Sequence, residues 1–160
     1  MKRGDRLAVT SGTLLGLGLG GFVDGILFPQ ILQWHEMVSS VIPPVDLVSV
    51  KTNMLYDGLF HAATWTMTLV GVVVLARAAD AERSSSVTRV LFPSMLLGWG
   101  LFNFVEGVID HQLLGLHHVH PGENQLAWDI GFLVSGLLFI AIGMAGLTRI
   151  FRLPHLRPAH

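Results

Sequence analysis

Cysteine is missing from the sequence, and charged residues are scarce. None of the 160 residues is cysteine, which excludes disulfide bonds, thiolate metal sites and thiol catalysis. Asp, Glu, Lys and Arg make up 13% of the chain, whereas a soluble domain usually has about 25%. The net charge of −1 gives no electrostatic reason to expect a nucleic-acid partner. So little charge is typical of a membrane protein, and only nitrogen and oxygen side chains are left as metal ligands.

Hydrophobic residues are abundant instead. They make up 51% of the sequence, and the mean hydropathy is +0.59. Mostly apolar segments cover about residues 7–37, 53–77, 87–119 and 126–151, and each exceeds the roughly 20 residues that a helix needs to cross a bilayer. We therefore expect an all-α fold, a four-helix transmembrane bundle in one integral membrane domain of residues 1–160, with the lipid bilayer as a partner.

Positive charges mark one side of the predicted bundle. They lie before the first span, between the second and third spans, and after the fourth, whereas the other two connections contain only Lys51. Because Lys and Arg accumulate in cytoplasmic segments, both termini of this multi-pass chain are predicted to be cytoplasmic. The residues that carry this prediction are Lys2, Arg3, Arg6, Arg77, Arg83, Arg89, Arg149, Arg152 and Arg157.

The third span repeats the first. The segment LGLGLGGFVDGILFPQILQWHEM (Leu15 to Met37) aligns with LGWGLFNFVEGVIDHQLLGLHHV (Leu97 to Val119) at a constant offset of 82 residues, with ten of 23 positions identical. Two apolar helices share Leu and Gly easily, but they rarely share a carboxylate, a glutamine and a histidine in register. The alignment pairs Asp24 with Glu106, Gln30 with Gln112, and His35 with His117.

The second and fourth spans match more weakly. YDGLF in the second span aligns with WDIGF in the fourth, which pairs Asp57 with Asp129. The repeating unit is therefore expected to be a two-helix hairpin, present once in about residues 7–77 and again in about residues 87–151. Because both hairpins begin on the same side, the repeats are predicted to be parallel and related by a pseudo-twofold axis along the membrane normal.

Ionisable residues collect in the outward half of the predicted bundle. A helical rise of about 1.5 Å per residue places one set roughly 12–20 Å below the outward helix ends and a second set near the outward surface. The deeper set is Asp24, His61, Glu106, Asp110 and His111. The outer set is His35, Asp57, His117, His118 and Asp129.

Helical spacing predicts which side chains share a face of the third span. Glu106 and Asp110 are four residues apart, and His117 follows Glu106 by eleven residues, so these three are expected on one stripe. His111 and His118 are seven residues apart and are expected on a neighbouring stripe.

Buried charges need a partner. A charged side chain at the bilayer centre costs about 2.5–3.5 kcal/mol on insertion scales, so several carboxylates must be protonated, paired, solvated or bound to a cation. Bundles with carboxylate and histidine ligands hold di-iron and di-manganese sites, and imidazole suits zinc, copper and iron. The leading hypothesis is a metal-binding membrane protein that holds one or two zinc, copper or iron ions with the deeper set, supported by the outer set. The sequence assigns no catalytic residue.

Single residues also have simpler explanations. Asp57 and Asp129 lie in the first turns of their spans, where a carboxylate favours the helix dipole. His35, His117 and His118 lie near the predicted surface, where interfacial histidines are ordinary. The deeper set has no comparably simple explanation, because burial makes an unpartnered ionisable group costly.

Four segments of this sequence are distinctive: GGFVDGILFPQILQWHEM, NMLYDGLFHA, GWGLFNFVEGVIDHQLLGLHHVH and WDIGFL. Together they resemble the sequences of a bacterial family of small four-span membrane proteins known as domain of unknown function 2243, and the resemblance covers nearly the whole chain. The resemblance brings no assigned activity. It implies the bacterial inner (cytoplasmic) membrane and, through neighbouring genes for haem–copper oxidase assembly, a copper- or haem-related role, redox or metal-handling, linked to the assembly of respiratory oxidases. A homo-oligomer or a respiratory-complex partner is expected. Members often carry His at the positions of Pro29 and Glu36, so it implies that the first repeat has lost two potential ligands.

Three other functions remain open at this stage. A b-type haem electron carrier would use His35 and His117 as axial ligands, but it leaves the carboxylates unexplained. A proton or metal-ion transporter fits intramembrane Asp, Glu and His residues, although the polar groups stop near the midplane. A structural assembly factor would use the polar cluster only to specify packing.

Overall fold

Four membrane-length helical rods form the protein. The structure is a computed structural model that describes residues 3–81 and 86–152; Lys2, Arg83 and Arg157, used above to predict orientation, lie outside these ranges. Within them there is no β-strand, and all four rods are long and apolar enough to cross a membrane. The expected all-α transmembrane fold is confirmed. The elements are α1 (Arg3–Ile26), the π-helix η1 (Leu27–Leu32), α2 (Leu47–Ala81), α3 (Ser86–Glu106), the π-helix η2 (Gly107–Leu113) and α4 (Gln125–Arg152).

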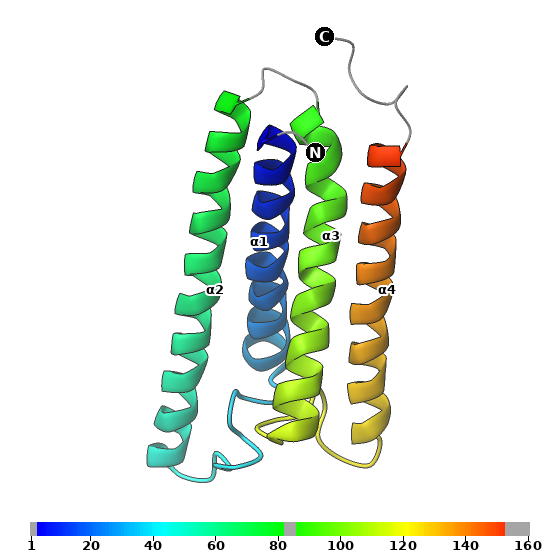
Figure 1. Cartoon of the computed structure of the whole chain (residues 1–160). Helices are drawn as coiled ribbons and strands as arrows, with labels where there is room; N and C mark the ends of the chain where they lie inside the picture. Colours follow the sequence, from blue (N-terminus) through cyan, green and yellow to red (C-terminus); the bar gives the residue numbers. More distant parts are fainter. Residues whose placement is uncertain (1–2, 82–85, 153–160) are drawn as a thin grey trace.

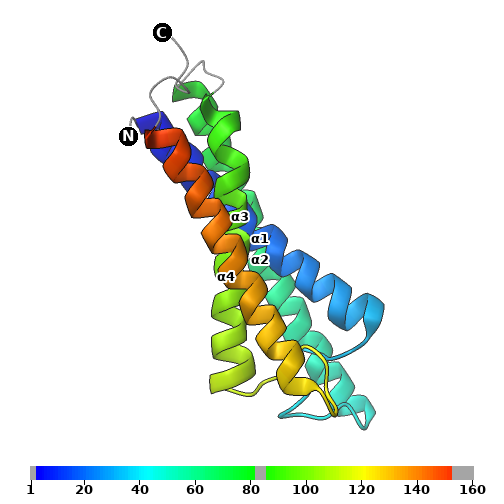
Figure 2. The same ribbon diagram turned by 90° about the vertical axis from the view of Figure 1, so that its right-hand side faces the viewer.

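The rods lie in the order α2, α1, α3, α4 (Figure 1). α1 and α3 pack against each other in the middle, α2 packs on α1, and α4 packs on α3. The view along the row shows α1 and α3 crossing, so that their ends diverge (Figure 2). The connections 33–46 and 114–124 meet at the end opposite the N-terminus, which we call the double-loop end.

The interior is small and polar, whereas the exterior is apolar. α2 buries only Asn53, Asp57, Thr64, Gly71 and Ala78, which follow one another at four- or seven-residue intervals. α4 buries its own stripe at seven-residue intervals, while Leu, Ile, Val and Met side chains on the remaining faces of both helices are exposed. Helices in a bilayer associate through small residues and interhelical hydrogen bonds because lipid already solvates the apolar side chains. This distribution is therefore what a lipid-facing exterior requires.

Glycines set the crossing of α1 and α3. A Cβ atom added to Gly16 would overlap the backbone carbonyl of Met95, and one added to Gly98 would overlap the carbonyl of Thr13. The two backbones touch directly at this point, which is the close approach that small residues allow between membrane helices.

The first and third helical rods end earlier than predicted. We expected helix up to Met37 and Val119, but helix stops at Leu32 and Leu113. In each case the helix passes into a π-helix, and a residue with positive φ follows: Gln33 at 55° and Gly115 at 57°. A left-handed residue cannot continue a right-handed helix, so the chain turns back into the protein. These residues are 82 apart, which supports the predicted duplication and its pseudo-twofold axis; both stay predictions.

α2 is longer than expected, because it begins at Leu47 instead of near residue 53. The Asp46 carboxylate accepts a hydrogen bond from the Ser49 backbone N–H (2.8 Å), and the Ser49 hydroxyl accepts one from the Asp46 N–H (3.0 Å). This reciprocal pair satisfies the free donors of the first turn. The helix start therefore lies at the cap and not at the beginning of the apolar stretch.

Candidate metal centre

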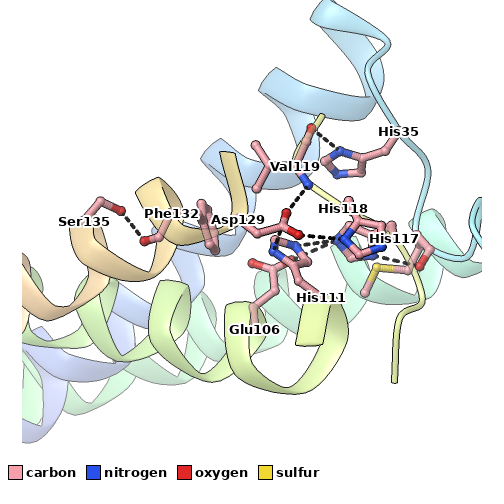
Figure 3. A network of polar contacts seen from close by, with 10 residues as sticks. His35, Glu106, His111, His117, His118, Val119, Asp129, Phe132 and Ser135 are labelled. Carbon is pink, nitrogen blue, oxygen red and sulfur yellow. Dashed lines mark hydrogen bonds and ion pairs between the residues drawn. The ribbon is translucent and has the colours of Figure 1, made fainter. Parts of the chain in front are cut away.

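Three buried side chains converge near the double-loop end. Glu106 ends α3, His111 lies in η2, and His117 lies in the connection to α4. One potential ligand atom from each lies within 4.8 Å of the other two. His111 Nε2 is 3.1 Å from His117 Nε2, and His117 Nε2 is 3.7 Å from Glu106 Oε1. None of the three residues is more than 4% exposed, and Figure 3 shows the two rings and the carboxylate facing a common point.

The π-helix selects His111 over Asp110. The backbone hydrogen bonds of a π-helix connect residues five apart, whereas those of an α-helix connect residues four apart. The fifth residue after Glu106 therefore lies on the same side of the helix as Glu106. That residue is His111, which is buried, whereas Asp110 is only partly buried. The predicted stripe of Glu106, Asp110 and His117 is kept in part: Glu106 and His117 approach to 3.7 Å, whereas His111 takes the buried place that regular α-helix would have given to Asp110.

His117 reaches the centre from a loop. It was placed near the surface on the assumption that helix continued, but the turn at Gly115 returns the chain and leaves His117 only 1% exposed. Its Nδ1 is 3.0 Å from the Met37 carbonyl oxygen. A carbonyl can only accept, so Nδ1 carries a proton, and in the neutral form of the ring Nε2 presents its lone pair toward Glu106 and His111.

Asp129 organises the opposite side of the centre. Its carboxylate accepts hydrogen bonds from His118 Nδ1 (2.7 Å) and the Val119 N–H (3.0 Å), and it lies 3.6 Å from His111 Nδ1. A carboxylate beside Nδ1 favours the proton on that nitrogen, so His111 also turns a bare Nε2 toward the centre. A carboxylate behind a histidine is the usual support of a metal-binding imidazole.

The buried Glu106 carboxylate is poorly satisfied. Neither of its oxygens has a well-formed hydrogen bond among the described residues, and the Asp24 side chain beside it is itself a carboxyl group. Two bare ring nitrogens 3.1 Å apart beside a carboxylate repel one another unless a proton or a cation lies between them. Two nitrogens bound to one tetrahedral zinc ion at about 2.0–2.1 Å lie about 3.3–3.4 Å apart, close to the observed separation. The donor set therefore fits a transition-metal ion.

His35 supports His117 from the other repeat. The two rings stack with centroids 4.5 Å apart, and His35 Nδ1 donates to the Val119 carbonyl (2.9 Å) as His117 Nδ1 donates to Met37. His117 follows His35 by 82 residues, and Val119 follows Met37 by 82 residues, so the two hydrogen bonds occupy corresponding positions in the two repeats. Burial, together with the neighbouring His117, lowers the pKa of His35 from its usual value to about 3. His35 is therefore neutral at physiological pH.

The other predicted ligands surround this centre without joining it. Asp24 is buried on α1 and interacts electrostatically with Glu106 and His117. Asp57 accepts a hydrogen bond from the Met37 N–H (2.8 Å), and His61 Nδ1 donates to the Asp57 carbonyl oxygen (2.7 Å). Of the ten predicted ligands, the structure thus brings Glu106, His111 and His117 together.

Sequence reasoning missed the groups that hold the rings. The carbonyls of Met37 and Val119 fix two tautomers, but a backbone carbonyl has no sequence signal of its own. Their positions depend on the turns at Gln33 and Gly115, which bring the two loops together.

Two cavities meet at His35. A pocket of about 600 Å³ opens at the double-loop end between the two connections, and its lining includes Glu36 and His118. A small inner cavity of about 10 Å³ lies beneath, lined by Asp24, Asp57, His61 and His117 among others. His35 is the one residue that lines both. The open pocket and the buried polar groups are therefore adjacent at this residue.

Comparison with known proteins places the chain in a family without supplying an activity. No curated protein and no solved structure matches the chain at a significant level. Residues 11–149 match the family described as "Predicted membrane protein (DUF2243)". That match spans most of the chain and reaches into all four helical rods, so this protein belongs to the DUF2243 family of predicted membrane proteins.

Proposed function

We propose that this protein is an integral membrane metal-binding protein that holds one first-row transition-metal ion with Glu106, His111 and His117. The observation that carries the proposal is the 3.1 Å approach of two buried Nε2 atoms, whose Nδ1 atoms both face acceptors, beside the buried Glu106 carboxylate. Two imidazoles and one carboxylate suit zinc and non-haem iron, and copper accepts the same nitrogen ligands. Three protein ligands leave a coordination position for water or a substrate.

The stacking of His35 on His117 argues against the haem alternative. A haem iron bound by both residues needs a porphyrin plane between them. Here the rings lie face to face with centroids 4.5 Å apart, and each is tied to the opposite loop through Nδ1. Both loops would have to separate to admit a porphyrin, so the centre suits a bare ion.

We propose further that the double-loop end faces the outside of a bacterial inner membrane. Support comes from the charge distribution of the sequence, because the connections 33–46 and 114–124 contain no Lys or Arg and Lys51 in the first turns of α2 is the only one near that end. The 600 Å³ pocket opens there. An ion would then enter from outside the cytoplasm and pass His35 to reach the centre.

Metal counting on purified protein tests the proposal. The protein is purified in detergent, stripped with a chelator, loaded separately with Zn²⁺, Cu²⁺ or Fe²⁺, and its metal measured by elemental analysis. His117→Ala, His111→Ala and Glu106→Gln should each lose one ion per chain or weaken its binding by at least about 100-fold, above the 10–100-fold effect of residues behind a ligand. Loading at 100 times Kd should stabilise the fold by about 2.7 kcal/mol.

His120→Ala is the matched control. His120 lies in the same connection, but its ring packs against Trp34 and Trp128 away from the three ligands. This variant should bind metal as the unmodified protein does. Equal metal content in the control and in all three ligand variants would exclude the centre, and a proton shared between His111 and His117 would then be the better account of their approach.

A further inference from the structure

The inner cavity beside His35 has the make-up of a cation site. It has a volume of about 10 Å³, is lined by two carboxylates and three imidazoles, and lies on the α2 side of His117. A space of that size admits one water-sized sphere. His61 Nδ1 donates to the Asp57 carbonyl, which leaves a lone pair on His61 Nε2. That nitrogen is buried and has no hydrogen-bond partner among the described residues.

Gly25 makes room for this nitrogen. A Cβ atom at Gly25 would lie 3.0 Å from His61 Nε2 and 2.9 Å from the Phe60 ring. At the corresponding position of the other repeat, 82 residues on, a Cβ at Gly107 would meet the side chain of Leu133 at 2.8 Å. The pairing of Asp57 with Asp129 brings His61 into register with Leu133. At this contact between the central and flanking helices, the glycine therefore faces the imidazole of His61 in one repeat and the side chain of Leu133 in the other.

The central helices show the opposite exchange. Pro29, which lines the inner cavity, is in register with His111. One half therefore takes its second imidazole from the π-helix and the other takes it from the flanking helix. Each half has a buried carboxylate on the central helix, a histidine in the loop, and an aspartate on the flanking helix that accepts a loop N–H: Asp24, His35 and Asp57 in one, Glu106, His117 and Asp129 in the other.

We propose that the inner cavity is a second cation site, in which His61 Nε2 and the Asp24 carboxylate bind a divalent transition-metal ion with His35 as the third protein ligand. Pro29 stands where the other repeat has His111, and His61 stands where it has Leu133, so each repeat has two imidazoles and a carboxylate. The two sites share no ligand, but they are neighbours, because the Asp24 side chain interacts with Glu106. Among the described residues only Glu106, His111 and His117 have ligand atoms within 4.8 Å of one another, so Asp24, His35 and His61 must close on the second ion as it binds.

Counting ions per chain in single and paired variants tests this inference. Zn²⁺-loaded protein should contain two ions, His61→Ala one, His111→Ala one, and the double variant none. One ion in the unmodified protein that persists in His61→Ala and disappears in His111→Ala would overturn the second site and leave the proposed centre standing. Two ions retained in His61→Ala would also overturn it. One ion lost in His61→Ala but none in His111→Ala would support this site and exclude the other.

A measurement on the unmodified protein removes any dependence on how the variants fold. Histidine side chains labelled with ¹⁵N are observed by NMR while Zn²⁺ is added. The Nε2 resonance of His61 should move to the position of a metal-bound nitrogen, with His120 as the unaffected reference. A His61 Nε2 resonance that is unchanged at saturating Zn²⁺ overturns the proposal.

Discussion

At the scale of single residues, the direction in which each ring nitrogen faces determines the chemistry of the centre. His117 and His35 each donate through Nδ1 to a loop carbonyl, and His111 Nδ1 faces Asp129. Three imidazoles are thereby held with their Nε2 atoms free of backbone acceptors. The backbone and one carboxylate orient the rings in the way that the proposed metal centre requires.

Asp129→Asn should weaken both the fold and the metal centre. The amide keeps an acceptor for the Val119 N–H but loses the negative charge shared by His111 and His118. We expect a loss of about 1–3 kcal/mol in the free energy of unfolding and a 10–100-fold weaker affinity for Zn²⁺. Thermal unfolding in detergent and competition with a chelator measure the two effects.

Glu123→Gln serves as the control for Asp129→Asn. It removes the same charge from an exposed position in the same connection and should leave stability and affinity unchanged. If both substitutions lower the affinity equally, general electrostatic attraction at this end accounts for the effect of Asp129.

At the scale of helices, two local features decide the ends and the crossing. The passage from α- to π-helix shifts which residue follows Glu106 on the inner face, and the glycine contacts bring α1 and α3 together. The apolar composition of the segments predicted that these helices exist. It contained no signal for the π-helices, because the hydrogen bonds of a π-helix depend on the packing and loops around it.

Gly98→Ala should destabilise the crossing of α1 and α3. The added methyl group meets the Thr13 carbonyl, which is backbone and cannot rotate away, so we expect a loss of about 1–3 kcal/mol. Gly131→Ala is the matched control, since nothing lies within 4 Å of its added Cβ and alanine favours helix by roughly 0.5–1 kcal/mol. Melting temperatures in one detergent compare the two, and equal melting temperatures would contradict the direct backbone contact.

Asp46→Ala should loosen the first turn of α2. The hydrogen bonds from Ser49 lower the pKa of the Asp46 carboxyl, so the ionised form is the one that the fold stabilises. This stabilisation is present above the unfolded pKa of about 3.9 and is lost as the pH falls through the lower folded value. Hydrogen exchange of residues 47–50 should be faster in the variant at pH 7. Equal protection at pH 7 would show that the cap is not formed.

At the scale of the whole molecule, the two connections create the functional end. They cover the inner cavity, form the 600 Å³ pocket, and exchange hydrogen bonds through His35 and His117. Neither hairpin holds its histidine alone, because each Nδ1 is satisfied by the loop of the other. Assembly of the two hairpins and formation of the centre are therefore one event.

The proposed orientation is tested by labelling with thiol reagents. The chain has no cysteine, so a single introduced thiol reports only on its own position. Val45→Cys, 83% exposed at the double-loop end, should react with a membrane-impermeant maleimide in cells with a permeable outer membrane. Ala79→Cys, exposed near the other end of α2, should react only after lysis. The reverse pattern would place the pocket on the cytoplasmic side.

The sequence by itself determined the membrane class, the four helical rods, the ligand chemistry and the presence of a buried polar centre. These properties follow from apolar length, from the absence of cysteine, and from the cost of burying carboxylates in lipid. Single-residue composition and spacing carry that information directly, so the set of ten candidates contained the three side chains that converge.

Only the tertiary structure decided which of the ten meet. Helical spacing put Glu106, Asp110 and His117 on one stripe with His117 near the surface. In the structure His117 is buried beside Glu106 and Asp110 is only partly buried, because the helix widens after Glu106 and ends at Leu113. The turn at Gly115 then returns His117 to the carbonyl of Met37, 80 residues away in the chain. A contact between two loops depends on the packing of α1 against α3, and no local pattern in the sequence encodes that geometry.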